Sequence, residues 1–345
     1  MSKKVKYKSL LSPGETVLIA IFFLAVLSLF YFTFFTPNYY NLSSPVKFEV
    51  KKGESFSQIA NRLYDANIIS GKLNFKIAGI LYGTQKKIKP ARYYIPNGLS
   101  YLGLIEYFID GKADYLKMVK LFDGSTSKSI ASRLRSELYV DSVAFIKELK
   151  NKKLLDSLSI DETSFEGYLL PQEYDLYERS SPREIIITIY NGWKKFICDS
   201  LKKSIVQTHR SIHDILTIAS IVNGETNKKD EMTKIAGVYY NRLKIGMKLQ
   251  ADPTIQYLQP NGSKRLSFDD LRNNSPYNTY KYFGLPPGPI DNPGKNAIIA
   301  SVYPDKHNYL YFVADGKGGH KFARTFTEHL KNVQLYKDNL RSSSK

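Results

Sequence analysis

The chain has 345 residues, 43% hydrophobic and 24% charged, which indicates a folded protein large enough for two modest domains. It contains one cysteine, Cys198, so an intrachain disulfide framework is excluded, and we expect this thiol to be a small buried side chain. The net charge of +18, from 50 Lys and Arg against 32 Asp and Glu, favours anionic partners. The basic residues are spread along the chain without a dense run around aromatic residues, so no nucleic-acid partner is expected.

The first element in chain order is an uncharged run, TVLIAIFFLAVLSLFYFTFF, at residues 16–35. About 20 apolar residues in a helix span the hydrocarbon core of a bilayer. Four lysines within the first eight residues predict a cytoplasmic N-terminus. A cleavable signal peptide is the alternative, but the run is long and FYFTFF stands where small cleavage-site residues belong. We expect a cytoplasmic tail at 1–15, a single-pass anchor in the inner (cytoplasmic) membrane at 16–36, and the remainder outside.

Two segments that follow the anchor resemble each other at a constant offset of 71 residues. These are KKGESFSQIANRL at 51–63 and FDGSTSKSIASRL at 122–134. In each, a strand-like run precedes a glycine turn, and a Ser or Thr then begins a helix with an Ile, Ala and Leu stripe. This pattern looks like the opening half of a LysM module, a βααβ unit that binds amino-sugar polymers. We expect a LysM-like subdomain at 44–115, and a second half-repeat with a helical connector at 116–163. A strand–helix unit without a ligand is the open alternative.

The remaining elements predict an α+β fold. Residues 91–113 read as a strand, a turn and a helix capped by Gly111, and residues 183–208 as one long amphipathic helix. A further helical pattern at 232–246 ends at Gly246, and the last hundred residues are rich in turns with short strands. Strands and helices alternate without a regular βαβ period, so we expect a mixed α+β domain at 164–340.

One acid lies on an apolar helical face in the segment DILTIASIVNGETNKKDE at 214–231. Glu225 continues a stripe of aliphatic residues spaced by three and four, namely Ile215, Ile218, Ile221 and Val222. Burial among aliphatic side chains raises the pKa of a carboxyl group, which can then donate a proton and later take one back. The alternative is a solvent-facing residue beyond a helix that stops at Gly224. Glycosidases usually pair such an acid with a second carboxylate, for which the sequence offers Asp252, Asp315, Glu166 and Glu173.

The loops after residue 246 suit a ligand rich in hydroxyl groups. They are MKLQADPTIQY at 247–257, SPYNTYKYFGLPPGPIDNPG at 275–294 and YLYFVADGKGGHKFARTFTEH at 309–329. Tyrosine rings stack on sugars, and Asn, Thr and Gln bond to hydroxyl and acetamido groups. No G-x-S-x-G elbow, zinc spacing or phosphate loop appears in the sequence, so we expect neither a metal nor a cofactor.

These motifs closely resemble the YceG-like endolytic murein transglycosylases, and the resemblance is densest from about 212 to 330. The resemblance implies a membrane-anchored lytic transglycosylase that cuts nascent peptidoglycan strands between N-acetylmuramic acid (MurNAc) and N-acetylglucosamine (GlcNAc). Because the sugar's own O6 hydroxyl attacks instead of water, the product carries a 1,6-anhydro-MurNAc end. Such an enzyme would terminate glycan elongation beside peptidoglycan synthases.

The resemblance also implies site residues. The catalytic acid would be Glu225, the second Glu of the family's E-K-E-[TA] segment, in which Asn223 and Gly224 here replace the first Glu and the Lys. Substrate-positioning residues would be Gln250, Asp252, Thr254 and Gln256 on one wall, and Asn278, Tyr280, His320 and Phe322 on another. Two alternatives are a catalytically impaired peptidoglycan-binding scaffold, which the changes at Asn223 and Gly224 would permit, and a muramidase with two carboxylates.

Overall fold

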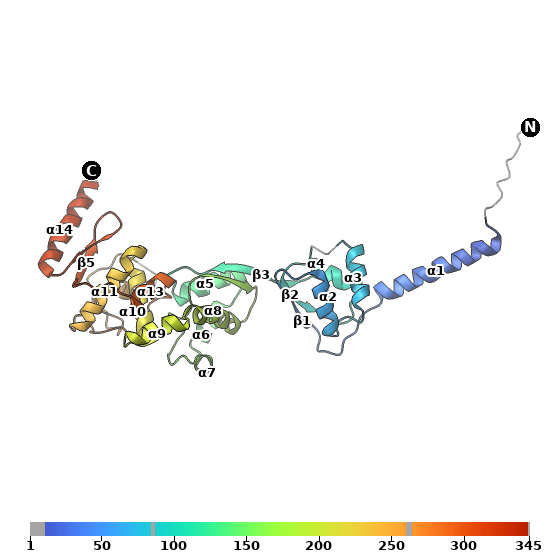
Figure 1. Cartoon of the computed structure of the whole chain (residues 1–345), viewed down its shortest axis with the longest axis horizontal. Coiled ribbons are helices and arrows are strands. Elements are labelled where there is room, and N and C mark those ends of the chain that lie inside the picture. The colour runs from blue at the N-terminus through green and yellow to red at the C-terminus, as the bar shows by residue number, and fades with distance from the viewer. Residues whose placement is uncertain (1–10, 84–86, 260–263, 344–345) are drawn as a thin grey trace, which may run out of the picture. The chain divides into compact units, whose positions relative to one another are not determined.

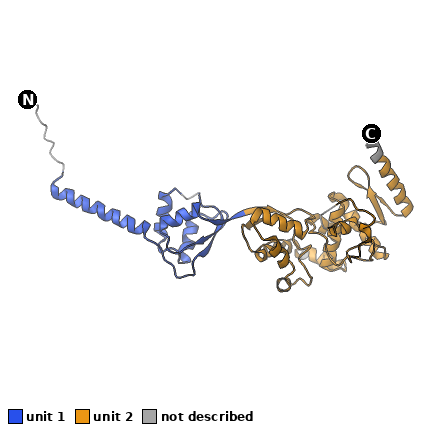
Figure 2. Ribbon diagram, turned by 180° about the vertical axis from the view of Figure 1, so that it is seen from behind, with its two compact units in different colours: residues 1–116 blue, residues 117–345 orange. Residues whose placement is uncertain are grey.

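The computed structural model of the chain describes residues 11–83, 87–259 and 264–343. The chain divides into two compact units, Met1–Leu116 (unit 1) and Lys117–Lys345 (unit 2), as Figure 2 shows. Both units combine helices with strands (Figure 1). The predicted α+β class with one N-terminal apolar helix is therefore confirmed.

Within residues 11–83 and 87–116, unit 1 has four helices and the first strands. In chain order these are α1 (Pro13–Phe35), β1 (Val46–Val50), α2 (Phe56–Asp65), α3 (Lys72–Leu81), β2 (Ala91–Ile95), α4 (Tyr101–Asp110) and the start of β3 (Ala113–Lys120).

Unit 2 is mainly helical. Its elements after β3 are α5 (Ser127–Leu138), α6 (Ser142–Glu148), α7 (Lys152–Ser157), β4 (Glu173–Tyr177), α8 (Pro182–Phe196), α9 (Asp199–Gln207), α10 (Ile212–Glu225), α11 (Lys229–Lys244), α12 (Asp252–Tyr257), the short 3-10 helix η1 (Asp270–Arg272), α13 (Lys295–Val302), β5 (Tyr311–Ala314), β6 (His320–Ala323) and α14 (Phe326–Ser343).

Helix α1 is long and apolar enough to cross a membrane. It begins at Pro13, three residues before the uncharged run, because Ser12 and Glu15 form a reciprocal capping box. Proline at the first helical position costs no hydrogen bond. At the other end, Phe34 is only 6% exposed and belongs to the hydrophobic core of unit 1. The end of α1 is thus packed against the rest of unit 1.

Unit 1 contains a strand–helix–helix–strand sequence. Strands β1 and β2 pair antiparallel from Val46 opposite Ile95 to Val50 opposite Ala91, with α2 and α3 between them in the chain. The core between helices and strands includes Phe75, which stacks on Phe56 with ring centroids 5.1 Å apart. Of this order, the repeat analysis predicted the first strand, the turn after it and the start of the first helix.

The repeated segments adopt the same local structure. Gly53 and Gly124 take φ values of +79° and +78°, a left-handed conformation that favours glycine. Two residues later, Ser55 caps α2 and Thr126 caps α5 through side-chain oxygens that accept backbone N–H bonds. The predicted equivalence of the turn and helix start is therefore confirmed. The strand order of the larger sheet is β1-β2-β3-β4.

Three expectations about unit 2 are wrong. The helix predicted over 183–208 is two helices, because Ile197 leaves the helical region at ψ 65° and Cys198 becomes the N-cap of α9. That cap position leaves Cys198 exposed instead of buried. The turn-rich C-terminal region also ends in the 18-residue helix α14, which the sequence analysis did not predict.

Helix α10 lies in the core of unit 2. Its residues from Ile215 to Asn223 are all buried, and α11, α12 and α13 contact it. This buried stretch ends at Asn223: Gly224 is exposed and Glu225, the last residue of α10, is half-buried. Glu225 interacts with Tyr239 of α11 and Asp252 of α12.

Candidate active site

Glu225 is the last residue of α10, so the helix continues through Gly224. The helix begins with a capping box between Ser211 and Asp214. At the other end, a Cβ on Gly224 would lie 2.6 Å from the Cβ of Pro253 in α12. Glycine at 224 thus permits α10 and α12 to approach closely, which brings the start of α12 beside Glu225.

The Glu225 carboxyl group is half-buried and bonded to a tyrosine. The Tyr239 hydroxyl donates a 2.6 Å hydrogen bond to Glu225 Oε1. Desolvation raises the pKa of Glu225 from 4.5 to about 7, and the charge of Asp252 adds to the increase. The Tyr239 hydrogen bond and the Arg242 charge act in the opposite direction. A carboxyl group with this pKa exchanges protons readily near neutrality.

Tyr239 and Arg242, one helical turn apart on α11, were missed by the sequence analysis. Tyr239 is 1% exposed, and its pKa lies well above 10 because of burial and the nearby Glu225. Arg242 is held by Leu310 and Leu249 carbonyl oxygens, so it is a fixed positive charge near the acid. A signal was present in the sequence, since these polar residues continue the buried face of Ile235.

Asp252 and Tyr280 form a second polar pair in this region. Asp252 is the first residue of α12, and the Tyr280 hydroxyl donates a short hydrogen bond to Asp252 Oδ1. Both groups interact electrostatically with Glu225. Of the predicted cleft residues, these two share the environment of the acid most directly.

Two predicted positioning residues are buried in the protein. Thr254 and Asn278 are each 0% exposed. The Thr254 hydroxyl donates to the Ala251 carbonyl oxygen, and the Asn278 amide donates to Leu271 and Asn273 carbonyl oxygens. These contacts fix the loop and helix that carry Tyr280 and Asp252.

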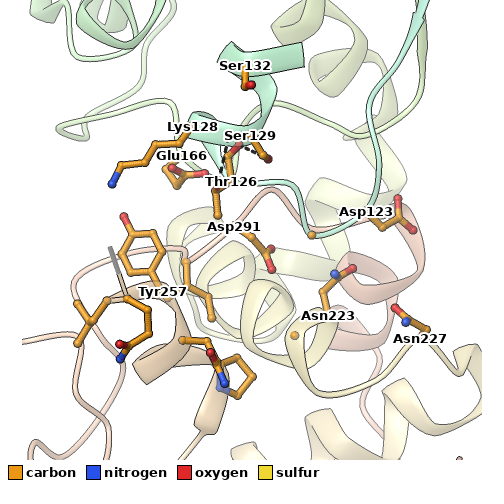
Figure 3. A pocket seen from close by; sticks show the side chains of 17 residues that line it. Asp123, Thr126, Lys128, Ser129, Ser132, Glu166, Asn223, Asn227, Tyr257 and Asp291 are labelled. Carbon is orange, nitrogen blue, oxygen red and sulfur yellow. Dashed lines mark hydrogen bonds between the residues drawn. The ribbon is translucent and has the colours of Figure 1, made fainter. Parts of the chain in front are cut away.

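Gln250 precedes α12, and Gln256 lies within it. Gln250 is exposed, has a φ of +47° and donates its backbone N–H to the Thr279 carbonyl oxygen at 3.1 Å. Gln256 lines a cavity of about 1080 Å³, and its amide is bonded to the backbone of Lys264. Figure 3 shows this cavity.

His320 and Phe322 lie on strand β6, which pairs antiparallel with β5. His320 Nδ1 lies 2.7 Å from Glu231 Oε2 in α11, and Glu231 Oε1 accepts the His320 backbone N–H. Phe322 packs against Phe312 with ring centroids 6.0 Å apart. Phe312 in turn meets the ring of Tyr239 edge to face, so β6 supports the acid through aromatic packing rather than directly.

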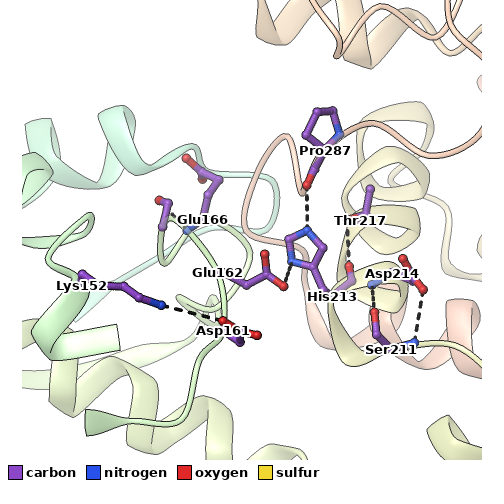
Figure 4. A network of polar contacts seen from close by, with 10 residues as sticks. Lys152, Asp161, Glu162, Glu166, Ser211, His213, Asp214, Thr217 and Pro287 are labelled. Atoms are coloured by element: carbon purple, nitrogen blue, oxygen red, sulfur yellow. Dashed lines mark hydrogen bonds and ion pairs between the residues drawn. The ribbon is translucent and has the colours of Figure 1, made fainter. Parts of the chain in front are cut away.

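A histidine at the start of α10 connects three segments (Figure 4). His213 Nε2 lies 2.9 Å from the Pro287 carbonyl oxygen, and Nδ1 lies 3.1 Å from Glu162 Oε1. Burial raises the pKa of Glu162, and the proximity of His213 opposes that increase. These contacts join the first turn of α10 to the loop that carries Pro287 and to the segment that carries Glu162. They lie at the opposite end of α10 from Glu225.

The four carboxylates considered as partners of Glu225 differ in position. Asp252 lies in its electrostatic environment, whereas Glu173 is exposed on β4. Asp315 accepts the backbone N–H groups of a turn, which lowers its pKa. Glu166 lines the cavity of Figure 3, and burial raises its pKa to about 7.

The α+β fold thus carries a half-buried carboxyl group with a raised pKa at the end of α10. The YceG-like family profile matches residues 48–335, and the chain belongs to this family. It is 31% identical to the endolytic murein transglycosylase of Bacillus subtilis over 84% of either chain. A pneumococcal protein of the same name is 29% identical, and the match spans 82% of this chain and 57% of that protein. The crystal structure of a YceG-like protein from Listeria monocytogenes has a TM-score of 0.59 and 27% identity, and the match covers 83% of this chain and 98% of that one.

Proposed function

We propose that the chain is an endolytic lytic transglycosylase that cleaves peptidoglycan glycan strands between MurNAc and GlcNAc. The observation that carries this proposal is the Glu225 carboxyl group, whose pKa is raised to about 7 by burial. The relatives from Bacillus subtilis and Streptococcus pneumoniae are named endolytic murein transglycosylases, which supports the same substrate.

In the proposed reaction, protonated Glu225 donates its proton to the glycosidic oxygen as the bond to the MurNAc anomeric carbon breaks. The resulting carboxylate then removes the proton from the O6 hydroxyl of that MurNAc, and O6 bonds to the anomeric carbon. One group therefore serves as acid and base, and the 1,6-anhydro end forms without an activated water. The pKa near neutrality suits both steps.

Neighbouring groups have supporting roles in this proposal. The Tyr239 hydroxyl bonds to Glu225 Oε1 and holds the carboxyl group in one orientation. Tyr280 bonds to Asp252 in the same way. The negative charge of Asp252 would stabilise the positive charge that develops on the sugar ring, while it also raises the pKa of Glu225.

We also propose that the βααβ segment of unit 1 is a LysM-like glycan-binding module. Its support is the order β1, α2, α3, β2 with an antiparallel strand pair. Helix α1 would anchor the protein in the cytoplasmic membrane, with the N-terminus inside and the chain after α1 outside, because lysines precede the helix. In this location the enzyme would work beside peptidoglycan synthases. We expect it to co-purify with them from solubilised membranes.

The proposed activity is tested by incubating the full chain, in detergent micelles, with purified glycan strands and analysing the products by mass. We expect 1,6-anhydro-MurNAc ends, and their loss in Glu225→Gln by about 100-fold or more. Glu173→Gln is the matched control, because Glu173 is exposed on β4. Reducing ends would instead indicate a muramidase, and intact strands would indicate a binding scaffold.

A further inference from the structure

Helix α3 of unit 1 is apolar on two opposite faces. Its inner face, with Phe75, Ala78 and Gly79, is buried in unit 1. The outer face carries four exposed aliphatic residues at helical spacings of three and four, which we call the outer stripe: Leu73, Ile77, Ile80 and Leu81. Their exposed fractions are 68%, 38%, 60% and 63%. A contiguous apolar surface of this kind marks a place where a protein contacts something other than water.

The start of α3 is attached to the end of the apolar helix α1. Asn38 lies three residues after the last residue of α1, and its Oδ1 atom accepts a 3.2 Å hydrogen bond from the Ser70 hydroxyl. Ser70 lies two residues before the first residue of α3. Helix α3 also contacts α1, and Figure 1 shows it at the face of unit 1 from which α1 leaves. The outer stripe therefore begins beside the end of α1.

These contacts bring α3 to the surface of the membrane that α1 would span. The uncharged part of α1, residues 16–35, is about 30 Å long, which equals the thickness of the hydrocarbon core of a bilayer. Three further residues extend the chain by at most about 10 Å, so Asn38 would lie at the level of the lipid headgroups or just beyond them. Ser70, bonded to Asn38, would lie at the same level.

The residues around the outer stripe suit an anionic membrane surface. Residues 72–89 contain five lysines and neither Asp nor Glu, and lysines near a membrane are attracted to anionic headgroups. One of them, Lys72, pairs with Asp65 at 3.3 Å. Tyr39 and Tyr82 are 77% and 42% exposed, and tyrosine is enriched where a protein meets the headgroups. Aliphatic residues beside lysines and tyrosines are typical of a helix that lies in the membrane interface.

We propose that the outer stripe of α3 contacts lipid in the headgroup region of the membrane, on the side where α1 ends. This inference rests on the proposed anchoring by α1, since it concerns the same membrane. The stripe and α1 would then hold unit 1 at two places. A second contact restricts the tilt and rotation of unit 1 about α1.

The contact is tested with a fluorophore on a single introduced cysteine of the full chain, in lipid nanodiscs of phosphatidylglycerol and phosphatidylethanolamine. The native cysteine is first removed by Cys198→Ser. The fluorophore is then attached in Leu73→Cys on the outer stripe, in Phe32→Cys on the exposed surface of α1, or in Lys51→Cys. Lys51 is an exposed residue that follows the end of β1 opposite the end paired with Ile95.

A fraction of the lipids carries a nitroxide quencher on the acyl chain close to the headgroup, and iodide serves as the quencher in water. We expect the nitroxide lipid to cause loss of fluorescence in Leu73→Cys and Phe32→Cys but not in Lys51→Cys. Iodide should quench Lys51→Cys only. No part of this measurement uses cleavage, so its result is independent of the proposed enzymatic activity.

The other outcomes contradict the proposal in different ways. If the nitroxide quenches Phe32→Cys but not Leu73→Cys, α1 is in the membrane and the outer stripe is not. If it quenches neither, the proposed anchoring fails together with this inference. If Leu73→Cys is protected from iodide but not quenched by the nitroxide, protein covers the stripe, as in a pair of chains, and the lipid contact is refuted.

Substitutions in the outer stripe separate lipid contact from a role in the fold. Ile80→Gln with Leu81→Gln removes apolar surface and retains good helix formers. The equilibrium between lipid-bound and free α3 should move about tenfold toward the free state, so the fluorophore at Leu73→Cys should regain its fluorescence. The melting temperature in detergent should not change, because both residues are more than half exposed.

Val143→Gln with Val206→Gln is the matched control, since both are exposed aliphatic residues of helices in unit 2. This pair should leave the quenching at Leu73→Cys unchanged. Undiminished quenching in the variant of the outer stripe would overturn the proposal. A lower melting temperature of that variant would also contradict it, because it would show that the stripe packs against protein.

Discussion

At the scale of single residues, the proposed chemistry depends on how the protein sets the proton affinity of one carboxyl group. Burial at the end of α10 raises the pKa of Glu225 to about 7, and the Tyr239 hydroxyl bond moderates that increase. The acid is therefore largely protonated up to neutrality, but its conjugate base is still accessible within the catalytic cycle.

The rate of cleavage should fall as pH rises above about 7, because the leaving oxygen needs a protonated Glu225. Tyr239→Phe removes a hydrogen bond that favours the carboxylate, so its alkaline limb should move to higher pH. The measurement is kcat against pH for both proteins. An unchanged limb in Tyr239→Phe would show that this bond does not tune the acid.

The same pKa shift makes a prediction about stability. The folded protein holds the Glu225 proton more tightly than the unfolded chain, whose carboxyl has the ordinary value of 4.5. The free energy of unfolding should then fall as pH rises from 4.5 to 7. Glu225→Gln removes this loss and should stabilise the protein at pH 8 by about 1–3 kcal/mol, with little effect at pH 4. Denaturant unfolding at the two pH values measures the difference, and an equal change at both would contradict the assignment.

At the scale of elements, the site depends on the close approach of α10 and α12. Gly224 permits that approach, since a Cβ there would lie 2.6 Å from Pro253 Cβ. Asn223 likewise has a defined role, because its amide oxygen holds the Gly294 backbone N–H.

Gly224→Ala should separate the two helices, destabilise the protein by about 1–3 kcal/mol and lower cleavage activity. Gly14→Ala is the control, since Gly14 also lies in a helix and a Cβ there would have no neighbour within 4 Å. Thermal unfolding and the product assay measure both effects. Wild-type stability in Gly224→Ala would contradict the packing role.

The features that could be predicted from the sequence are those with a local cause. The apolar run gave α1, and the spacing of Ile215, Ile218 and Ile221 placed Glu225 on a buried face. The unpredicted features depend on tertiary contacts. The spacing of Ile235, Tyr239 and Arg242 indicates a buried face, but the role of Tyr239 depends on the packing of α11 beside α10, which brings its hydroxyl to Glu225. The break at Ile197 likewise has no Pro or Gly to mark it.

At the scale of the whole molecule, the chain between α1 and β1 is only partly a linker. Asn38 bonds to the Leu99 carbonyl oxygen, and Tyr40 is buried with its hydroxyl on the Ile95 carbonyl oxygen. These residues hold the end of α1 against β2 and the start of α4, whereas residues 41–45 are exposed. An insertion at 41–45 alone would therefore lengthen an exposed loop and leave the spacing unchanged, unless those contacts are also removed.

If the distance from the membrane determines where a strand is cut, insertion of a flexible segment between Leu42 and Ser43 should shift the distribution of product lengths in a variant with Asn38→Ala and Tyr40→Ala, which removes the contacts that hold the end of α1 against β2 and α4. Both residues are exposed, so the fold should tolerate the insertion. The lengths are measured by chromatography of strands synthesised in vesicles that carry the protein. Product lengths equal to those of the wild type would refute a role for this spacing.

The most direct test of the central claim, that Glu225 cleaves the strand without an activated water, is cleavage in water enriched in ¹⁸O. We predict products with 1,6-anhydro-MurNAc ends, one water lighter than hydrolysis products and free of the isotope, and none of them in Glu225→Gln. Incorporation of ¹⁸O at new reducing ends would contradict the claim, because it would indicate that a second carboxylate activates water. Asp252, whose charge acts on Glu225, would then be the candidate for that carboxylate.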